Sequence, residues 1–335
     1  MSYSKKWHRL WKIFPIVAAV AVTGVLAIRF SGAAGYIVPS EAETGVITGN
    51  AKTINSPGAS GSGNNAVAFG TDSTGTGGSE TPLGLTGNWN MIFQDEFSQP
   101  LDWNKWMPCQ SSGWLKGSRQ GQGCENWGSA GIYTKDNLVV RDGILNLEAR
   151  KSGNGWTSGA ISTAEDSAGI SPATYKPFTY TYGYLEVRTK AVPGSGFWSA
   201  VWQMPNGGGG IMEMDLMEVN GVLPETDPNN FGMTLHCDFS DRPVDDATKY
   251  NQPLSIYSSF HVLGMDWTPT YIDWYVDGKK VKRIEKSICP KFPDRPEFFI
   301  ANLSVGQEQF NLFPSASQQF PVSMQLDYVR IWQRK

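Results

Sequence analysis

Three carboxylates stand close together in one apolar stretch, the run Glu213-Met214-Asp215-Leu216-Met217-Glu218. If this stretch is a β-strand, alternate side chains point to opposite faces, so Glu213 and Asp215 share one face while the apolar residues between them enter a core. Strict alternation would then bury Glu218 among apolar side chains, which costs several kcal/mol of desolvation. We therefore predict a β-bulge near Leu216 and Met217 that returns Glu218 to the face of the other two acids.

Such a row of acids suits one kind of chemistry in particular. In double-displacement glycoside hydrolysis, one carboxylate attacks the anomeric carbon while the other donates and then removes a proton. Clusters of acids also occur on solvated strands and in calcium loops. Calcium loops are rich in Gly, Asn and Asp, however, whereas this stretch is rich in Met and Leu and ends at the turn-forming pair Asn220-Gly221. Its composition therefore favours a catalytic strand.

The surrounding sequence has the pattern of an all-β domain. Apolar and polar residues alternate over 145–150 and again over 184–188, as in half-buried strands. The pairs Asp142-Gly143 and Asp277-Gly278 each separate two apolar runs, which predicts two tight hairpins. Pro and Gly recur so often that no window of about 12 residues shows a helical stripe. We expect an antiparallel sandwich of about 250 residues.

The N-terminus predicts export. Four basic residues among the first twelve positions precede an apolar run over residues 13–28. This run is shorter than the ~20 residues that a comfortable membrane span needs. We interpret residues 1–30 as a signal peptide or an uncleaved signal anchor, and either one places the rest of the chain outside the cell or on its surface.

Composition also predicts where the folded part begins. Gly, Ser, Thr, Ala and Asn dominate residues 31–87, and such segments cannot bury enough apolar surface to offset chain entropy. We therefore predict a flexible linker over 31–87. The folded catalytic domain is expected over residues 88–335, where tryptophans and alternating apolar residues appear.

Charge and composition exclude other classes of protein. The 335 residues are 40% hydrophobic and carry a net charge of −3, as expected for one ordinary core. Lys and Arg total 28 against 31 Asp and Glu, so no basic face is available for phosphates and nucleic acid is not an expected partner. The four cysteines are not spaced as CxxC pairs, and the chain has only three histidines, which argues against a zinc site.

In an exported protein the four cysteines are better explained as disulfides. Three connectivities are possible. We favour Cys109 with Cys124 and Cys237 with Cys289, because short loops are the easiest to close.

Further motifs accompany the acidic stretch, in a fixed order along the chain. They are Asp95-Glu96-Phe97, Tyr182-Gly183-Tyr184-Leu185-Glu186-Val187-Arg188, Gly196-Phe197-Trp198-Ser199-Ala200-Val201-Trp202, Phe260-His261, Trp267, Trp274-Tyr275-Val276-Asp277-Gly278 and Leu326-Asp327-Tyr328-Val329-Arg330-Ile331-Trp332. With the E-x-D-x-x-E form of the acidic stretch, they make residues 89–335 resemble glycoside hydrolase family 16, the laminarinase and lichenase group. The resemblance implies an all-β, concanavalin A-like β-jelly-roll sandwich of two antiparallel sheets with a concave substrate cleft.

The resemblance also implies roles for individual residues. Glu213 matches the nucleophile, Glu218 the general acid and base, and Asp215 the group between them that holds a proton or a hydrogen bond. The residues implied as substrate contacts are Trp198, Trp202, Trp127, Asn126 and His236. No cofactor is implied for catalysis. A structural calcium ion is implied at Glu96, the backbone oxygen of Gly143 and Asp327.

The activity that follows is a retaining endo-glycosidase that hydrolyses β-1,3- or mixed β-1,3-1,4-glucan through a covalent glycosyl-enzyme intermediate. Two alternatives stay open. The same fold and mechanism act on other polysaccharides such as agarose or carrageenan, or transfer the sugar to another sugar hydroxyl. A non-catalytic glucan-binding protein has the same sandwich, but such proteins usually lack one or both glutamates. We expect a monomer whose partner is the polysaccharide.

Overall fold

The computed structural model describes residues 51–55, 65–69, 81–110, 124–125, 129–167, 169–206, 212–220, 231–237, 256–289 and 291–335. The chain divides into two compact units, Met1–Thr76 and Gly77–Lys335. The predicted signal segment over residues 1–30 lies outside the described residues. Within those residues, no helix is long and apolar enough to cross a membrane.

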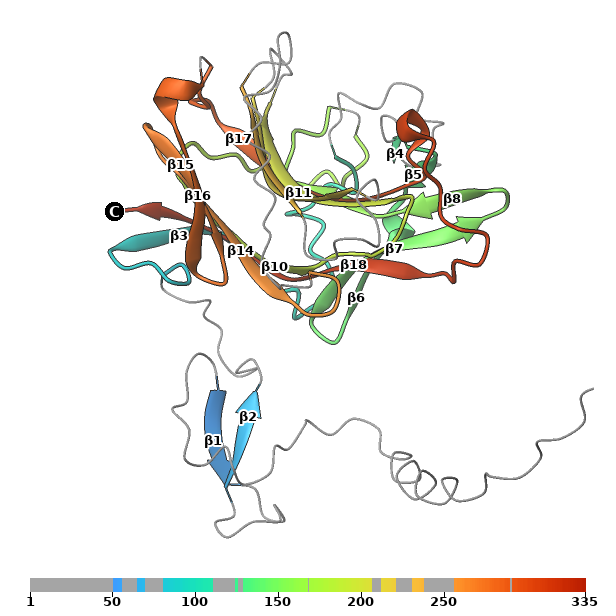
Figure 1. Cartoon of the computed structure of the whole chain (residues 1–335), viewed down its shortest axis with the longest axis horizontal. Helices are drawn as coiled ribbons and strands as arrows, with labels where there is room; N and C mark the ends of the chain where they lie inside the picture. Colours follow the sequence, from blue (N-terminus) through green and yellow to red (C-terminus); the bar gives the residue numbers. More distant parts are fainter. Residues whose placement is uncertain are drawn as a thin grey trace, which may run out of the picture. The chain divides into compact units, whose positions relative to one another are not determined.

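The first unit contains an antiparallel hairpin of β1 (Ala51–Asn55) and β2 (Asn65–Phe69), drawn in blue in Figure 1. The hairpin lies inside the range 31–87, whose average composition predicts a linker. Its strands contain the strand-forming residues Ile54, Val67 and Phe69, which a count over the whole range dilutes. For the rest of the range the linker stays a prediction.

The second unit is built from two sheets (Figure 1). In spatial order, the larger sheet joins β16 (Lys279–Glu285), β15 (Tyr271–Val276), β14 (His261–Trp267), β10 (Gly183–Lys190), β18 (Val322–Arg334), β7 (Ile144–Ser152), β8 (Gly155–Ser158), β5 (Gly131–Tyr133) and β4 (Cys124–Glu125), with β3 (Trp89–Asp95) on β18 and β6 (Leu138–Arg141) on β7. The smaller sheet joins β13 (Gly232–His236), β12 (Glu213–Asn220), β11 (Phe197–Pro205), β17 (Glu297–Val305) and β9 (Ala160–Ser162). Single turns of 3-10 helix follow at η3 (Lys135–Asn137), η4 (Lys286–Ile288) and η5 (Glu308–Phe310).

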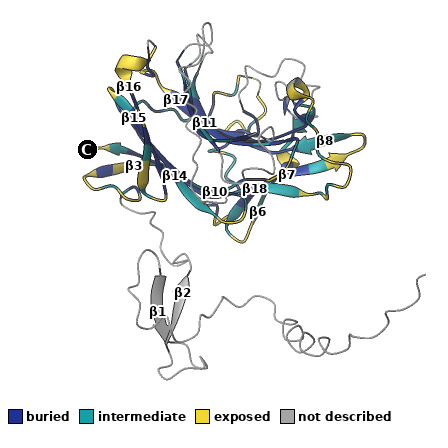
Figure 2. Ribbon diagram, viewed as in Figure 1, coloured by how far each residue is buried: buried dark blue, intermediate teal, exposed yellow. Residues whose placement is uncertain are grey.

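The main core lies between the two sheets, where Figure 2 shows the strands in the dark blue of buried residues. The larger sheet contributes side chains such as Leu185 and Met265, and the smaller sheet contributes Val201, Met214 and Phe299. All five are inaccessible to solvent. The sandwich predicted from the sequence is confirmed, because both sheets bury side chains in one core between them, and the strands pair antiparallel except for β5 with β8.

Both predicted hairpins are present. Asp142 and Gly143, with φ of 52° and 74°, join β6 to β7, and Asp277 and Gly278, with φ of 47° and 75°, join β15 to β16. Two successive residues with positive φ make the turn whose twist matches that of the flanking strands, and Asp-Gly adopts it readily. The first turn therefore sets the pairing of β6 with β7, and the second that of β15 with β16, which lie behind the acidic strand.

Both predicted disulfides are also present. Cys109 is bonded to Cys124, and Cys237 to Cys289. The second bond ties the residue after β13 to the residue after η4, so it joins the end of the smaller sheet to the larger one.

The second unit begins before residue 88, where composition places the domain boundary. The backbone N–H of Leu83 donates to the carboxylate of Glu186 at 2.7 Å. Gly84 lies so close to Gly278 that a Cβ on Gly84 would stand 2.1 Å from the carbonyl oxygen of Gly278. Residues 81–87 are therefore packed on the larger sheet rather than belonging to a linker.

Candidate active site

The predicted bulge is present in β12. On the β11 side, Asp215 pairs with Trp202 and Met217 with Val201, so the register skips Leu216. On the β13 side, Asp215 pairs with Thr234 and Glu218 with Gly232, so two residues of β12 face one residue of β13. This two-against-one count is what defines a β-bulge.

Burial along β12 follows from the bulge. Leu216 and Met217 are adjacent in sequence, yet both are completely buried in the core between the sheets. Glu218 is half-buried, like Glu213, while Asp215 between them is only 1% exposed. The bulge thus keeps Glu218 out of the apolar core and returns it to the outer face of the smaller sheet.

His236 lies against this row of acids. The register places it opposite Glu213 on β13. Its Nε2 atom is 3.1 Å from Oδ2 of Asp215 and 3.7 Å from Oε1 of Glu213. The donor atoms of the three side chains lie within 4.8 Å of one another, which is close enough to share a proton or to hold a cation. The histidine that the family resemblance singled out is therefore next to the acids.

The acids raise one another's pKa. Burial raises the pKa of Glu213 well above its usual value, and the charges of Asp215 and Glu218 raise it further against the opposing effect of His236. The pKa of Asp215 is also raised well above its usual value, first by burial and then by Glu218. The cluster consequently retains a proton at a pH where isolated carboxyl groups are ionised.

Two predicted aromatic contacts lie on β11, beside the acids. Trp202 pairs with Asp215 but is only 6% exposed, and its indole N–H donates to Oδ1 of Asn302 at 2.8 Å. Trp198 is half-buried, four residues earlier, and its ring centre is 6.0 Å from that of Phe310. Because Ala200, between the two tryptophans, pairs with Glu218, Trp198 lies beyond the Glu218 end of the row.

The structure does not test every predicted contact. Asn126 and Trp127 lie outside the described residues. Asn302 and Phe310 contact the two tryptophans of β11 and were not predicted as site residues. They lie about 100 positions after β11 in the sequence, and no motif links them to it.

The residues implied as calcium ligands have other partners. Arg330 binds both carboxylate oxygens of Glu96, each at 2.7 Å, and Arg188 binds the carboxylate of Asp327. Gly143 lies in the β6–β7 turn. An ion at this position has to compete with two guanidinium groups for the same oxygens.

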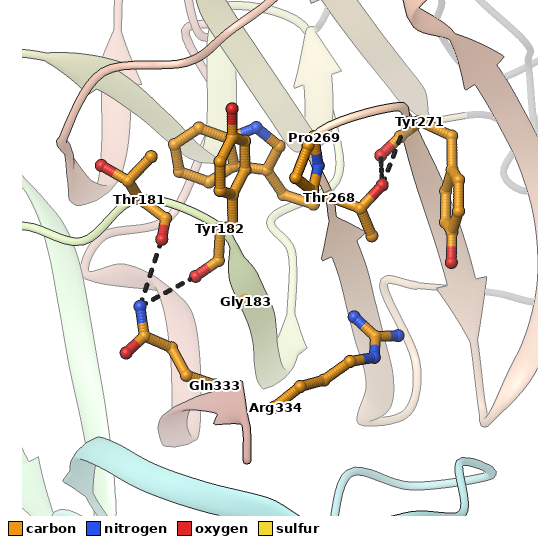
Figure 3. Close-up of a pocket in the computed structure, with 9 residues that line it drawn as sticks. Thr181, Tyr182, Gly183, Thr268, Pro269, Tyr271, Gln333 and Arg334 are labelled. Carbon is orange, nitrogen blue, oxygen red and sulfur yellow. Dashed lines mark hydrogen bonds between the residues drawn. The ribbon is translucent and has the colours of Figure 1, made fainter.

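A pocket of about 520 Å³ opens at a different place, on the larger sheet (Figure 3). Its lining residues are Thr181, Tyr182, Gly183, Trp267, Thr268, Pro269, Tyr271, Gln333 and Arg334. Several polar groups there already bond one another: Nε2 of Gln333 donates to the carbonyls of Thr181 and Tyr182, and the Thr268 hydroxyl donates to the carbonyl of Tyr271. No carboxylate is among these described lining residues, so the pocket does not offer the pair of acids that β12 does.

Comparison with known proteins agrees with this geometry. The family model described as glycosyl hydrolases family 16 matches residues 128–328, which is more than half of the chain. The chain belongs to this family. The fold is accordingly the family's β-jelly roll, as the sequence motifs implied.

Individual relatives fit the same assignment. Glucan endo-1,3-beta-glucosidase A1 of Niallia circulans is 30% identical over 73% of this chain, and a beta-glucanase of Rhodothermus marinus is 26% identical over 73% of it. The matches span 38% and 85% of the two relatives' own lengths. The solved catalytic domain of an endo-1,3-beta-glucanase (laminarinase) from Thermotoga petrophila RKU-1 is 27% identical with a TM-score of 0.58, covering 75% of this chain and 100% of that chain.

Proposed function

We propose that the chain is a retaining endo-glycosidase that hydrolyses β-1,3- or mixed β-1,3-1,4-glucan. The single observation that carries the proposal is the bulge in β12, which gathers Glu213, Asp215 and Glu218 on one half-exposed face. The similarity to an endo-1,3-beta-glucosidase, a beta-glucanase and a laminarinase supports the choice of substrate.

Each carboxylate has a task in the reaction. The Glu213 carboxylate attacks the anomeric carbon while Glu218 protonates the glycosidic oxygen, so the bond breaks and one part of the chain leaves as an alcohol. Glu218 then takes a proton from water, and the resulting hydroxide equivalent displaces Glu213 from the sugar. Both glutamates return to their starting protonation states, and the β configuration is kept.

Asp215 also holds a proton, besides the one that Glu218 donates. It is the least exposed of the three acids, so ionisation is least favourable there. As a neutral group it donates a hydrogen bond to a neighbouring carboxylate without adding a second negative charge beside that of Glu213. His236, 3.1 Å away, orients it. Trp198, with its partly exposed ring, stacks on the sugar beyond Glu218, while the buried Trp202 forms the floor.

The stereochemistry of the first product tests the covalent route. NMR during early hydrolysis of laminarin should show the β anomer first, and early α anomer contradicts the proposal. Azide sharpens the assignment of roles: with an activated aryl glucoside, Glu213→Ala should form the α-glycosyl azide and Glu218→Ala the β-glycosyl azide. The reverse pattern means that the two roles are exchanged.

A panel of polysaccharides tests the substrate class. Laminarin and lichenan should be cut into oligosaccharides of intermediate size, whereas agarose and carrageenan should remain intact. Release of fragments from agarose or carrageenan alone would replace the glucanase proposal with the other specificity. Products longer than the substrate would identify a transglycosylase, and binding without any cleavage a glucan-binding protein.

We also propose that the protein is exported and acts as a monomer. The basic and apolar N-terminal pattern supports export, and two disulfides are typical of oxidising compartments outside the cytoplasm. Cell fractionation with N-terminal sequencing of the product separates a cleaved signal from an anchor. Light scattering of the purified protein measures its mass in solution, and a dimer would contradict the monomer.

A calcium ion at Glu96, Gly143 and Asp327 stays a prediction. Thermal unfolding in calcium chloride and in a chelator tests it. A melting temperature that rises with calcium supports the site, and an unchanged one means that Arg330 and Arg188 are the lasting partners of the two carboxylates.

A further inference from the structure

The bulge in β12 turns backbone groups out of the regular ladder, and these groups need partners. Two carbonyls at the bulge accept hydrogen bonds from side chains. The indole N–H of Trp274 donates to the carbonyl of Asp215 at 2.9 Å. The ammonium of Lys282 donates to the carbonyl of Met233 at 2.6 Å, and Met233 is the residue of β13 that faces the bulge.

Both donors come from the opposite sheet. Trp274 lies on β15 and Lys282 on β16, where the register places them directly opposite one another. The Lys282 ammonium is 5.1 Å from the centre of the Trp274 ring, a cation–π distance. The two side chains thus form one unit that reaches across the core to the back of the catalytic strand.

Burial makes this unit unusual. Trp274 is inaccessible to solvent and Lys282 is 7% exposed, and Lys282 is the one buried lysine in the part of the chain that the structure describes. A buried ammonium is costly unless it is hydrogen-bonded and faces negative charge. Lys282 is hydrogen-bonded to the Met233 carbonyl and packs on the face of the Trp274 ring, and its charge opposes the rise in the pKa of Asp215 that burial causes.

We propose that Trp274 and Lys282 are positioning residues, which hold the bulge from behind so that Glu218 shares the face of Glu213. Neither residue touches the reacting atoms. The inference rests on the proposed function for its consequence in catalysis, whereas the fixed geometry of the bulge is a property of the fold alone. A misplacement of about 1 Å in a catalytic group lowers the rate by about 100-fold.

Two substitutions test the proposal. Trp274→Phe removes the N–H but keeps an aromatic ring, and Lys282→Met removes the charge and the donor but keeps the length of the side chain. We expect each to lower kcat on laminarin about 10- to 100-fold while KM changes less than about threefold, since the substrate contacts on the outer face are untouched. Lys282→Arg, which keeps charge and donors, should recover most of the loss.

Trp267→Phe is the matched control. Trp267 is equally buried on the neighbouring β14, and its indole N–H also donates to a backbone carbonyl, that of Pro293 at 3.1 Å. It should lose similar stability but keep kcat. If Trp274→Phe and Lys282→Met keep kcat as Trp267→Phe does, or if they raise KM alone, the two residues are ordinary core and the proposal is overturned.

Amide hydrogen exchange separates this inference from the proposed function. Trp274→Phe and Lys282→Met should speed exchange in the peptide over residues 214–219, relative to Trp267→Phe, whether or not the wild type cleaves glucan. An inactive wild type rejects the proposed function. Unchanged exchange over 214–219 rejects the inference, even in an active enzyme.

Discussion

Buried acids on the two sheets have different partners. Asp266 and Asp273 lie directly opposite one another on β14 and β15, and each is 2% exposed. Each is bound by both arms of its own guanidinium, Asp266 by Arg334 and Asp273 by Arg283, at 2.6–2.8 Å. On β12 of the smaller sheet, the acids meet one another and a histidine instead.

The difference shows in the titration of the acids. Glu148 of the larger sheet is 2% exposed. Burial works to raise its pKa, but hydrogen bonds from Arg150 and Arg141 bring the net value below the usual one. Asp215 is as buried as Glu148, yet its pKa is raised well above the usual value. Arginines therefore compensate the buried Asp266, Asp273 and Glu148 of the larger sheet, although burial still raises the pKa of Glu186 on β10. Glu213 and Asp215 of β12 have no such arginine partners among the described residues, as expected where stability is given up for chemistry.

The largest effect should come from breaking the cluster on β12. Glu213→Gln removes the attacking oxygen, so kcat on laminarin should fall about 10³-fold or more. Binding of a laminari-oligosaccharide, measured by calorimetry, should stay within about threefold, because Gln keeps the shape of the cleft. Activity near that of the wild type would show that Glu213 is not the nucleophile.

The next effect should come from breaking a neutralised pair. Arg334→Met leaves the buried Asp266 carboxylate without its cation, and the free energy of unfolding should fall by about 3 kcal/mol. Arg141→Met is the matched control, since Arg141 is as exposed as Arg334 and Glu148 is as buried as Asp266, but Glu148 keeps Arg150. It should cost less than about 1 kcal/mol. Equal losses in the two variants would mean that a remaining second guanidinium does not lower the cost. Urea unfolding at pH 7 measures both.

Glu213→Gln should raise the free energy of unfolding, whereas Arg334→Met should lower it. Because the folded pKa of Glu213 is raised, the folded protein resists ionisation that the unfolded chain undergoes above about pH 4.5. The penalty is absent at lower pH and grows as the pH rises towards the folded pKa. We expect the variant to be more stable than the wild type at pH 8 and no more stable at pH 4. A loss of stability at pH 8 would show that ionised Glu213 does not destabilise the fold beside Asp215 and Glu218.

Much of the site was predictable, for local reasons. The bulge at Leu216 and Met217 follows from counting faces along one strand, and the Asp-Gly hairpins from turn geometry. The disulfides follow from loop length. Each of these depends on residues close in sequence, or on a pattern that one strand carries alone.

The rest depends on register between distant strands. Lys282 reads as a surface residue in the run Lys279-Lys280-Val281-Lys282-Arg283, and only the pairing of β15 with β16 turns it inward beneath β12. The pairing of Glu96 with Arg330, 234 positions apart, is equally invisible in the sequence. Sequence patterns therefore locate the catalytic strand but miss what supports it and what neutralises the charges elsewhere.

Glu297 at the start of β17 is neither one of the acids paired with arginine on the larger sheet nor one of the three acids of β12. It is inaccessible to solvent, and neither carboxylate oxygen has a hydrogen-bond partner among the described residues. Burial raises its pKa well above the usual value, Arg295 opposes the rise, and the charge of Glu213 adds to it. Ionisation of Glu297 in the folded protein is therefore unfavourable, as it is for Glu213 and Asp215 on β12. Glu297 alternates along β17 with the residues that face the cleft, so it lies on the core side.

Glu297→Gln tests whether a raised pKa in a buried acid results from burial alone or from a role in catalysis. The folded pKa of Glu297 is raised, so the cost of ionisation is absent below about pH 4.5 and grows as the pH rises. The variant should therefore be more stable than the wild type at pH 7 and no more stable at pH 4, as urea unfolding at the two pH values measures. Since Glu297 does not face the sugar, kcat should stay within about twofold. A large loss of kcat would instead make Glu297 part of the catalytic cluster. A raised pKa in a buried acid would then indicate a catalytic role for Glu297 as well as for the acids of β12.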